Sequence, residues 1–461
     1  MSSKRNPVIT IPMVEGHTTC PKGGGVEVEV HDAGGGLNEP EVKRRHILPK
    51  AVAVGITAGV IASAFRLTLE MVESLRESMI AQLPRGSALA AAVTGGTILG
   101  GLALWLVRRF APETAGSGIP HLQSVLSGER EMRWKRVLPV KFIAGVLGIG
   151  GGLALGREGP TVQMGGASGM MVAGWFRIRT GFGEKKALMS AGAGAGLAAA
   201  FNAPLAGVIF VLEELQRSFT PVVFVAAFLA SVCGDVVSRL LAGDSPIFHL
   251  RTLPDIPLRE LPLALLLGIL AGFAGIIFNR CLLGSLNGFE KLTRSSWVPG
   301  AIAGGLAGLA AWTMPGLAGG GGSIADHAIA GGIALSLLPV LLIARFALTM
   351  VSYGSGAAGG IFAPMLVIGA LGGLLLGQSI ESLFPAALGH PEAFAVLGMG
   401  ALFTAVVRAP LTGVVLMVEM TGHYGFMLPL LVCCLTAYGV TEHMGDPPIY
   451  EALRHRGKKA E

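Results

Sequence analysis

Apolar segments follow one another with little interruption from about residue 47 to residue 442, and several are too short to cross a bilayer upright. A transmembrane helix needs about 20 apolar residues, whereas the segments 187–201, 204–216 and 409–420 are shorter and are flanked by Gly or Pro. Broken helices are tolerated within a membrane only where they are buried in protein or line a wet cavity. We therefore expect a bundle of tilted, partly non-spanning helices.

Composition supports the membrane class. Of the 461 residues, 52% are hydrophobic and only 14% are charged, whereas soluble domains have about 25% charged residues. With 6% aromatic residues and no alternating segments, the chain does not fit an outer-membrane barrel. The 69 glycines allow helices to approach closely. We predict an all-α polytopic membrane protein.

The net charge of +6 needs no nucleic-acid partner, since basic residues gather in the cytoplasmic loops of membrane proteins. Lys and Arg cluster within 43–45, 130–141, 177–186 and 454–459, which predicts that both termini are cytoplasmic. The five cysteines offer neither a disulfide framework nor metal-ligand spacing. The G-x-G-x-x-G match at 354–359 lacks the preceding strand of a dinucleotide site. We expect no cofactor, no metal and no enzymatic activity.

The apolar region repeats itself. Residues 203–208 (APLAGV) match 409–414 (APLTGV) at an offset of 206, and the glycines and proline of 150–160 recur within 354–364 at an offset of 204. Two related halves with interrupted helices at corresponding positions are typical of secondary transporters, whose site lies between the halves. Cytoplasmic termini are compatible with inverted repeats.

These patterns divide the chain into three parts. Residues 1–46 are polar and interrupted by Gly, which predicts a flexible cytoplasmic tail. A transmembrane transport domain is expected over 47–445, with repeat halves at about 47–245 and 255–445. A cytoplasmic C-terminal helix and tail are expected over 446–461.

The most informative acid is Glu158, in the sequence GREGP at 156–160. Between residues 142 and 176 the only charged side chains are Arg157 and Glu158. A carboxylate within a bilayer costs about 3 kcal/mol and marks ion or proton handling. The flanking glycines and Pro160 break the helix and leave amide N–H groups free beside the acid. A structural pair with Arg157 is the alternative, but adjacent residues on a helix do not face each other.

Two further breaks offer polar groups to an ion. The sequence GSGIP at 116–120 presents a hydroxyl and free amides, although a Ser N-cap with Pro in the first turn explains the same residues. The sequence GGIFAP at 359–364 corresponds to GREGP but has Phe362 in place of Glu158. Its alternative is a Gly hinge with a packed aromatic. Partial charges at a helix end bind an anion weakly enough to release it.

Three other residues each have a structural and a functional interpretation. Glu213 and Glu214 end an uncharged run, and Arg217 follows one turn later. A surface pair with Arg217 is the structural interpretation, which we prefer for Glu213; Glu214 is instead a candidate to take protons from the cytoplasm. Tyr450 alone would be an interfacial aromatic.

Together, GSGIP, GREGP, GGIFAP and the late Tyr450 resemble the CLC family of chloride channels and proton–chloride antiporters. The resemblance covers nearly all of 47–455, and the segment 199–214 is similar to the bacterial antiporters. It implies a homodimer in which each subunit has its own anion path between two inverted halves. Ala358 and Ser218 depart from the usual pattern without touching the anion ligands.

The resemblance also implies roles for individual residues. Ser117 and Tyr450 would donate hydroxyls to a central chloride, and the amides of Ile361 and Phe362 would complete its shell. Glu158 would be the outer gate and proton carrier, and Glu214 the internal proton-transfer acid. The supporting residues of the three motifs are Gly116, Gly118, Pro120, Arg157, Gly159, Pro160 and Gly360.

We therefore expect a secondary active transporter that exchanges chloride for protons in a bacterial inner membrane. The acid at Glu214 favours exchange, because channel members of the family usually lack it, and Ser117 favours chloride over nitrate. An uncoupled chloride channel of the same fold is the alternative. A membrane receptor or scaffold that uses the tail 1–46 is a second rival, which predicts no ion flux.

Overall fold

The computed structural model describes residues 44–178, 182–243, 256–293, 295–385 and 388–459. The tail predicted over 1–46 thus lies outside the described residues except for its last three. The described part contains seventeen α-helices and no strand beyond two isolated bridges. Eight helices form a first series: α1 (Arg44–Gln82), α2 (Arg85–Phe110), α3 (Ile119–Leu126), α4 (Trp134–Gly150), α5 (Glu158–Trp175), α6 (Phe182–Phe201), α7 (Pro204–Phe210) and α8 (Pro221–Ala242).

A second series of eight helices follows the first, and like the first it begins with its longest helix and has a helix of eight residues as its third member. Its members are α9 (Leu261–Leu292), α10 (Val298–Thr313), α11 (Gly322–Ile329), α12 (Leu338–Gly354), α13 (Phe362–Leu383), α14 (Ala393–Val407), α15 (Pro410–Thr421) and α16 (Met427–His443), and α17 (Ile449–Lys459) ends the chain. Helices α4 and α12 begin 204 residues apart, as do α5 and α13. The internal repeat seen in the sequence is therefore a repeat of structure.

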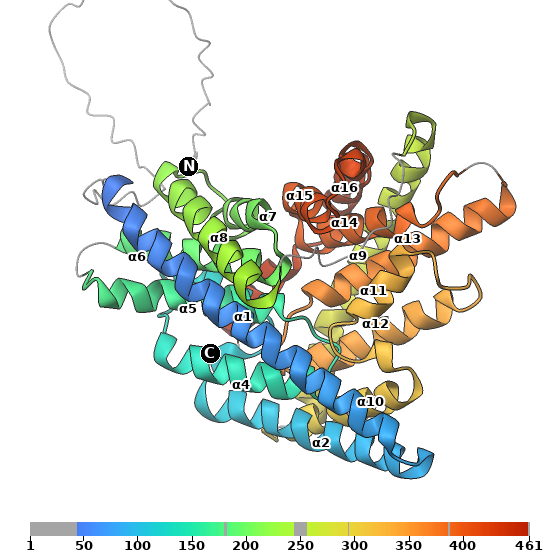
Figure 1. Cartoon of the computed structure of the whole chain (residues 1–461), viewed down its shortest axis with the longest axis horizontal. Coiled ribbons are helices and arrows are strands. Elements are labelled where there is room, and N and C mark those ends of the chain that lie inside the picture. The colour runs from blue at the N-terminus through green and yellow to red at the C-terminus, as the bar shows by residue number, and fades with distance from the viewer. Residues whose placement is uncertain (1–43, 179–181, 244–255, 294, 386–387, 460–461) are drawn as a thin grey trace, which may run out of the picture. The chain divides into compact units, whose positions relative to one another are not determined.

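Six of the described helices are long and apolar enough to cross a membrane, namely α1, α2, α8, α9, α13 and α16. Others are shorter, as expected from the broken apolar segments. Helix α7 has seven residues and continues as a π-helix over Val211–Gln216, and α3 and α11 have eight residues each. In Figure 1 the first series runs from blue to green and the second from yellow to red, on either side of the region where the broken helices meet.

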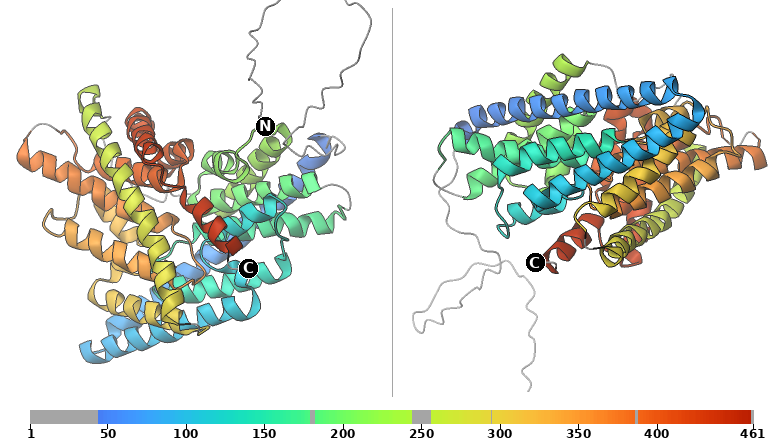
Figure 2. Two further views of the ribbon diagram at one scale, coloured as in Figure 1. Left: turned by 180° about the vertical axis from the view of Figure 1, so that it is seen from behind. Right: turned by 90° about the horizontal axis from the view of Figure 1, so that it is seen from below.

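Glycines allow close contacts between helices, both across the two series and within the first. A methyl group on Gly96 of α2 would collide with the carbonyl of Gly304 on α10, and these two helices lie side by side in both views (Figures 1 and 2). A methyl on Gly165 of α5 would likewise meet α6 at Gly192. Part of the high glycine content thus serves backbone-to-backbone packing.

Two glutamates join the two series reciprocally near the short helices. Glu213 accepts hydrogen bonds from the amides of Leu411 (3.0 Å) and Thr412 (2.7 Å) at the start of α15. Glu419 of α15 does the same for the amides of Leu205 (3.0 Å) and Ala206 (2.7 Å) at the start of α7. Each carboxylate therefore caps a helix of the other series, where the helix dipole favours negative charge. The surface pair that we preferred for Glu213 with Arg217 is wrong.

We expect Glu213→Gln to lower stability without stopping transport. The amide side chain keeps one oxygen but loses the charge that strengthens both bonds to α15, a loss of about 2 kcal/mol. Thermal unfolding of the purified protein in detergent measures the effect. Glu381→Gln at the end of α13 serves as the control, and an unchanged unfolding temperature for Glu213→Gln would contradict the capping role.

Candidate functional site

The three broken segments of the sequence meet at the centre of the described bundle. Gly156 and Gly360 exchange backbone hydrogen bonds of 2.7 Å in both directions. Gly116 accepts a bond of 3.0 Å from the amide of Gly359. A Cβ on Gly159 would lie 2.9 Å from the Ser117 Cβ and 3.0 Å from the Gly360 Cα. The glycines are thus needed for close approach of the loops that precede α3, α5 and α13.

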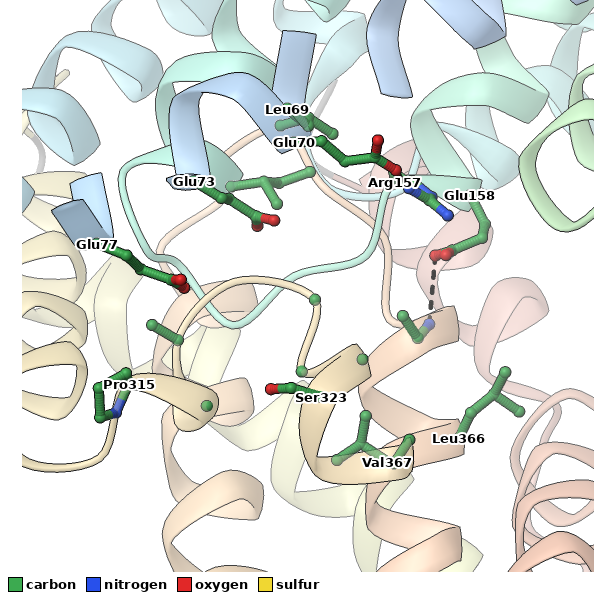
Figure 3. A pocket seen from close by; sticks show the side chains of 18 of the residues that line it. Leu69, Glu70, Glu73, Glu77, Arg157, Glu158, Pro315, Ser323, Leu366 and Val367 are labelled. Carbon is green, nitrogen blue, oxygen red and sulfur yellow. Dashed lines mark hydrogen bonds and ion pairs between the residues drawn. The ribbon is translucent and has the colours of Figure 1, made fainter. Parts of the chain in front are cut away.

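Glu158 begins α5 and is 3% exposed. Its Oε2 accepts a hydrogen bond of 3.3 Å from the amide of Ala363, in the first turn of α13 (Figure 3). First-turn amides have no acceptor within their own helix, so together with the helix dipole they form an anion site. The carboxylate of Glu158 therefore occupies the place that a free anion would take at α13.

Ile361 and Phe362 lie at this same helix start, and both are fully buried. The ring of Phe362 packs among three other rings, with centroids 5.4 Å away for Phe201, 6.1 Å for Phe210 and 4.5 Å for Phe403. The packed-aromatic interpretation is therefore correct for the side chain. It does not compete with an anion at the backbone amides.

Ser117 and Tyr450 are both buried, at 1% and 0% exposure. The N-cap of α3 is Gly118, with φ of 81°, so Ser117 is not the cap, although its oxygen accepts a bond of 3.3 Å from the amide of Ile119. Pro120 lies in the first turn as expected. The Tyr450 hydroxyl has no hydrogen-bond partner among the described residues. A buried hydroxyl of this kind is suited to donate to an ion, and an interfacial aromatic would be exposed.

Glu214 lies in the π-helix after α7 and is 2% exposed. Its Oε1 accepts a hydrogen bond of 2.7 Å from Nε2 of Gln123, and it lies 3.9 Å from Arg217. Arg217 in turn donates at 2.7 Å to Glu451 on α17, which lowers the pKa of the Glu451 carboxyl. Glu214 is thus buried close to charged groups of the C-terminal helix. Isolated π-helical turns are frequent at functional sites.

Tyr450 is close enough to Tyr353, Glu214 and Glu158 for its hydroxyl to interact electrostatically with all three. Helix α17, which carries Tyr450, packs against α3 (Figure 2). The structure therefore brings together the acid of the first broken helix, the buried tyrosine and the internal acid. These residues are 292 positions apart in the sequence at most.

Sequence reasoning missed several groups that build this site. Lys141 was counted in a cytoplasmic basic cluster, but its side chain is fully buried and its Nζ donates to the carbonyls of Thr114 (2.9 Å) and Gly116 (2.6 Å). That assignment of Lys141 is wrong. The amide of Ser117 donates to Tyr353 Oη at 3.5 Å, and Gln123 holds Glu214. The position of Lys141 in an apolar run was the available signal.

Glu158 also borders a cavity of about 310 Å³ (Figure 3). The lining includes Glu70 and Glu73 of α1, Arg157, and Ser323 at the start of α11. The cavity therefore joins the buried carboxylate of Glu158 to acids whose side chains are partly exposed, Glu70 and Glu77.

The C-terminal helix is held by ionic contacts outside the membrane-spanning segments. Glu129, in the loop between α3 and α4, binds Arg454 and Lys458 of α17, the latter at 2.8 Å. The hydrogen bond from Arg454, followed by that from Lys458, holds the pKa of the Glu129 carboxyl at about 2. These contacts anchor the helix that carries Tyr450.

The lowered pKa of Glu129 predicts how this anchor depends on pH. A carboxyl with a depressed pKa stabilises the folded state fully above its unfolded pKa of about 4.3, and the contribution is lost as the pH falls toward 2. After correction for the intrinsic pH dependence of amide exchange, we therefore expect weaker protection of 449–459 below pH 4 than at pH 7 in the wild type. Glu129→Gln should show fast exchange already at pH 7, and equal exchange in both proteins at pH 7 would contradict the anchoring role.

Comparison with known proteins agrees with this arrangement. The family model described as voltage gated chloride channel matches residues 99–442. The chain belongs to this family, the CLC family. It is 41% identical over 422 residues to the H(+)/Cl(-) exchange transporter ClcA of Vibrio parahaemolyticus, covering 90% of each chain. It is 41% identical over 418 residues to the protein of the same name from Yersinia pseudotuberculosis, covering 89% of this chain and 87% of the relative.

Solved CLC structures extend the match to the fold. A slow cyanobacterial Cl-/H+ antiporter superposes with a TM-score of 0.85 at 38% identity, covering 90% of this chain and 98% of that one. A eukaryotic CLC transporter gives 0.75 at 25% identity, covering 89% and 74%. The predicted fold class is confirmed: this is an all-α polytopic membrane protein with two inverted repeats of tilted, partly non-spanning helices.

Proposed function

We propose that this CLC protein is a secondary active transporter that exchanges chloride for protons. The observation that carries the proposal is the Glu158 carboxylate, bound at the first-turn amide of Ala363. When a titratable carboxylate occupies an anion site, chloride binding at that site becomes coupled to protonation of the carboxylate. Chloride and carboxylate compete for the same partial positive charge, and protonation removes one competitor.

The residues named from the sequence take definite roles in this proposal. Chloride lies between the hydroxyls of Ser117 and Tyr450 and the amides of Ile361 and Phe362, where the orphaned Tyr450 hydroxyl supports a ligand. Glu158 is the outer gate, which leaves the path when it is neutral. Glu214, buried beside Arg217 and Glu451, passes protons between the cytoplasm and Glu158. Chloride and the proton are the cargo, and no cofactor takes part.

The cycle follows from these roles. When Glu158 is ionised, it blocks the anion path at α13. A proton from the outer cavity neutralises it, and the vacated amides accept chloride. The proton then leaves inward by way of Glu214 as chloride moves outward, or the reverse. One carboxylate cannot be both ionised at α13 and protonated, so the two fluxes are tied together.

We further propose a homodimer in a bacterial inner membrane, with both termini cytoplasmic. The resemblance of the motifs supports this assembly. Leu205 and Leu411, at the two Glu-capped helix starts, are half-exposed and occupy equivalent positions in the two repeats. The same apolar face fits a second copy or lipid.

The test is chloride-driven proton movement in vesicles reconstituted with the purified protein. With equal pH on both sides at the start, chloride flowing out of the vesicles should drive protons into them. Removing the membrane voltage with a potassium ionophore should not stop this proton uptake. Chloride flux without any proton movement would favour the uncoupled channel. No flux of either ion would favour the receptor or scaffold.

A further inference from the structure

The outer cavity carries charged groups that the exchange cycle above does not use. Helix α1 contributes Glu70, Glu73 and Glu77, which recur at the spacing of one helix face, together with Arg76. Figure 3 shows the three acids and Arg157 around the space beside Glu158. Of the three acids, Glu70 contacts Arg157.

Arg157 is fixed by two contacts. Its Nη1 lies 3.2 Å from Oε1 of Glu70, and its Nη2 donates to the carbonyl of Ala200 at 3.5 Å. Glu70 also binds Arg66 of its own helix at 2.9 Å. The Arg157 side chain is 21% exposed and that of Glu70 is 48% exposed. Glu70 thus links α1 to the residue directly before the gate.

The charge of Arg157 acts on Glu158, since the two residues adjoin and their charges interact. A cation beside the gate favours the ionised carboxylate and also attracts chloride. A carboxylate bound to that cation opposes both effects. The consequence for transport depends on how much of the Arg157 charge Glu70 neutralises.

We propose that Glu70 is a positioning residue for the outer gate: by pairing with Arg157 it sets the pH at which Glu158 releases the anion path. This inference rests on the proposed role of Glu158. Without Glu70, the guanidinium is free to turn toward Glu158 and its charge is no longer balanced. The gate then stays ionised to lower pH, and the outer mouth attracts chloride more strongly.

The other charged groups around the cavity have contacts of their own. Arg76 donates to the Gly150 carbonyl at 2.9 Å and lies 3.4 Å from Glu77. Glu73 approaches Gly319 in the loop before α11, and its charge interacts with those of Arg76 and Arg157, although it forms no ion pair with Arg157 among those described. That loop is held from behind by Arg345 of α12, which donates to the carbonyls of Leu317, Gly319 and Gly320.

Helices α13 and α15 contribute only apolar residues to the lining (Ala363, Leu366, Val367 and Met420), and α11 adds the uncharged Ser323. Outside the cavity, the charge of Glu158 also acts on the Tyr450 hydroxyl. Glu70 is therefore distinguished from the other acids of the cavity by its bond to Arg157.

The test is the pH dependence of chloride flux in vesicles with varied external pH. In Glu70→Gln we expect the half-maximal pH to fall by about 0.5 unit, the size expected for a partly exposed ion pair, and the external chloride KM to fall about twofold. Glu77→Gln removes a charge from the same helix face without a bond to Arg157, so it should shift the profile by less than half as much. Glu70→Asp should restore most of the wild-type profile.

A double-mutant cycle separates action through Arg157 from a general charge effect. In the Arg157→Gln background, adding Glu70→Gln should shift the profile by less than half of its effect in the wild type. An equal shift in both backgrounds, an equal shift in Glu77→Gln, or no shift in Glu70→Gln would each overturn the proposal.

The two proposals fail in different ways. If the wild type moves chloride without protons, or if Glu158→Gln keeps the coupling, the role of Glu158 is wrong. If Glu158→Gln uncouples transport while Glu70→Gln leaves the pH profile in place, only the inference about Glu70 is wrong. Normal folding of Glu70→Gln is checked by its elution as a single species in detergent.

Discussion

Glu158→Gln is expected to carry chloride while moving protons at least about 100-fold more slowly than the wild type, the usual scale for removing a proton-transfer group. Glutamine has the shape of the protonated acid but can neither bind nor release a proton. It is also uncharged, so it competes weakly for the amide of Ala363 at the start of α13. The outer path should therefore stay open at every pH.

The measurement is proton uptake driven by a chloride gradient, with chloride flux recorded in the same vesicles. Chloride flux in Glu158→Gln should remain within about threefold of the wild type and should lose its dependence on external pH. Glu77→Gln, in the same cavity and 57% exposed at its side chain, is the matched control and should remain coupled. Coupled proton uptake in Glu158→Gln would exclude the gating role.

The helix break at Glu158 could be predicted because its signals are local. Gly and Pro flank Glu158 within five residues, and they break a helix wherever the surrounding fold places it. The same holds for GGIFAP at 359–364, whose break coincides with the start of α13. The repeat of these signals at an offset of 204 also revealed the structural repeat.

The partners of buried polar groups could not be predicted in this way. Glu213 binds α15 some 198 positions away, and Gln123 reaches Glu214 across 91 positions. Because Arg217 is close in the sequence, an ion pair with it was the simplest interpretation for Glu213. The amides at the start of α15 instead give its carboxylate charge-assisted hydrogen bonds, which are stronger than an exposed ion pair. Pairings of this kind depend on how helices pack, which no local pattern encodes.

Lys141 illustrates a different cause of error. Near a run of basic residues it looks like part of a cytoplasmic loop, but it follows Val140 inside α4, where its neighbours are apolar. The buried ammonium is satisfied by the carbonyls of Thr114 and Gly116, so it fixes the loop that carries Ser117. A count of charged residues in a sequence window cannot distinguish a buried lysine that binds backbone carbonyls from a solvent-exposed lysine in a loop.

Glu214→Gln should abolish coupled proton movement by a different route. Glu214 accepts the hydrogen bond of Gln123 within the π-helix, whereas Glu158 is bound at the start of α13. A glutamine there keeps the size of the side chain but cannot carry a proton, so we expect proton flux to fall about 100-fold. Chloride flux should persist, because Glu158 still exchanges protons with the outer cavity.

The pH dependence of the remaining chloride flux distinguishes the role of Glu214 from that of Glu158. In Glu214→Gln, chloride flux should still rise as the external pH falls, since the gate remains titratable, whereas in Glu158→Gln that dependence disappears. The adjacent Glu213→Gln is the matched control: its carboxylate caps α15, so the variant should be less stable but fully coupled. Proton uptake at the wild-type rate in Glu214→Gln would mean that protons reach Glu158 from the cytoplasm by another path. Loss of coupling in Glu213→Gln alone would assign the internal transfer to the neighbouring acid instead.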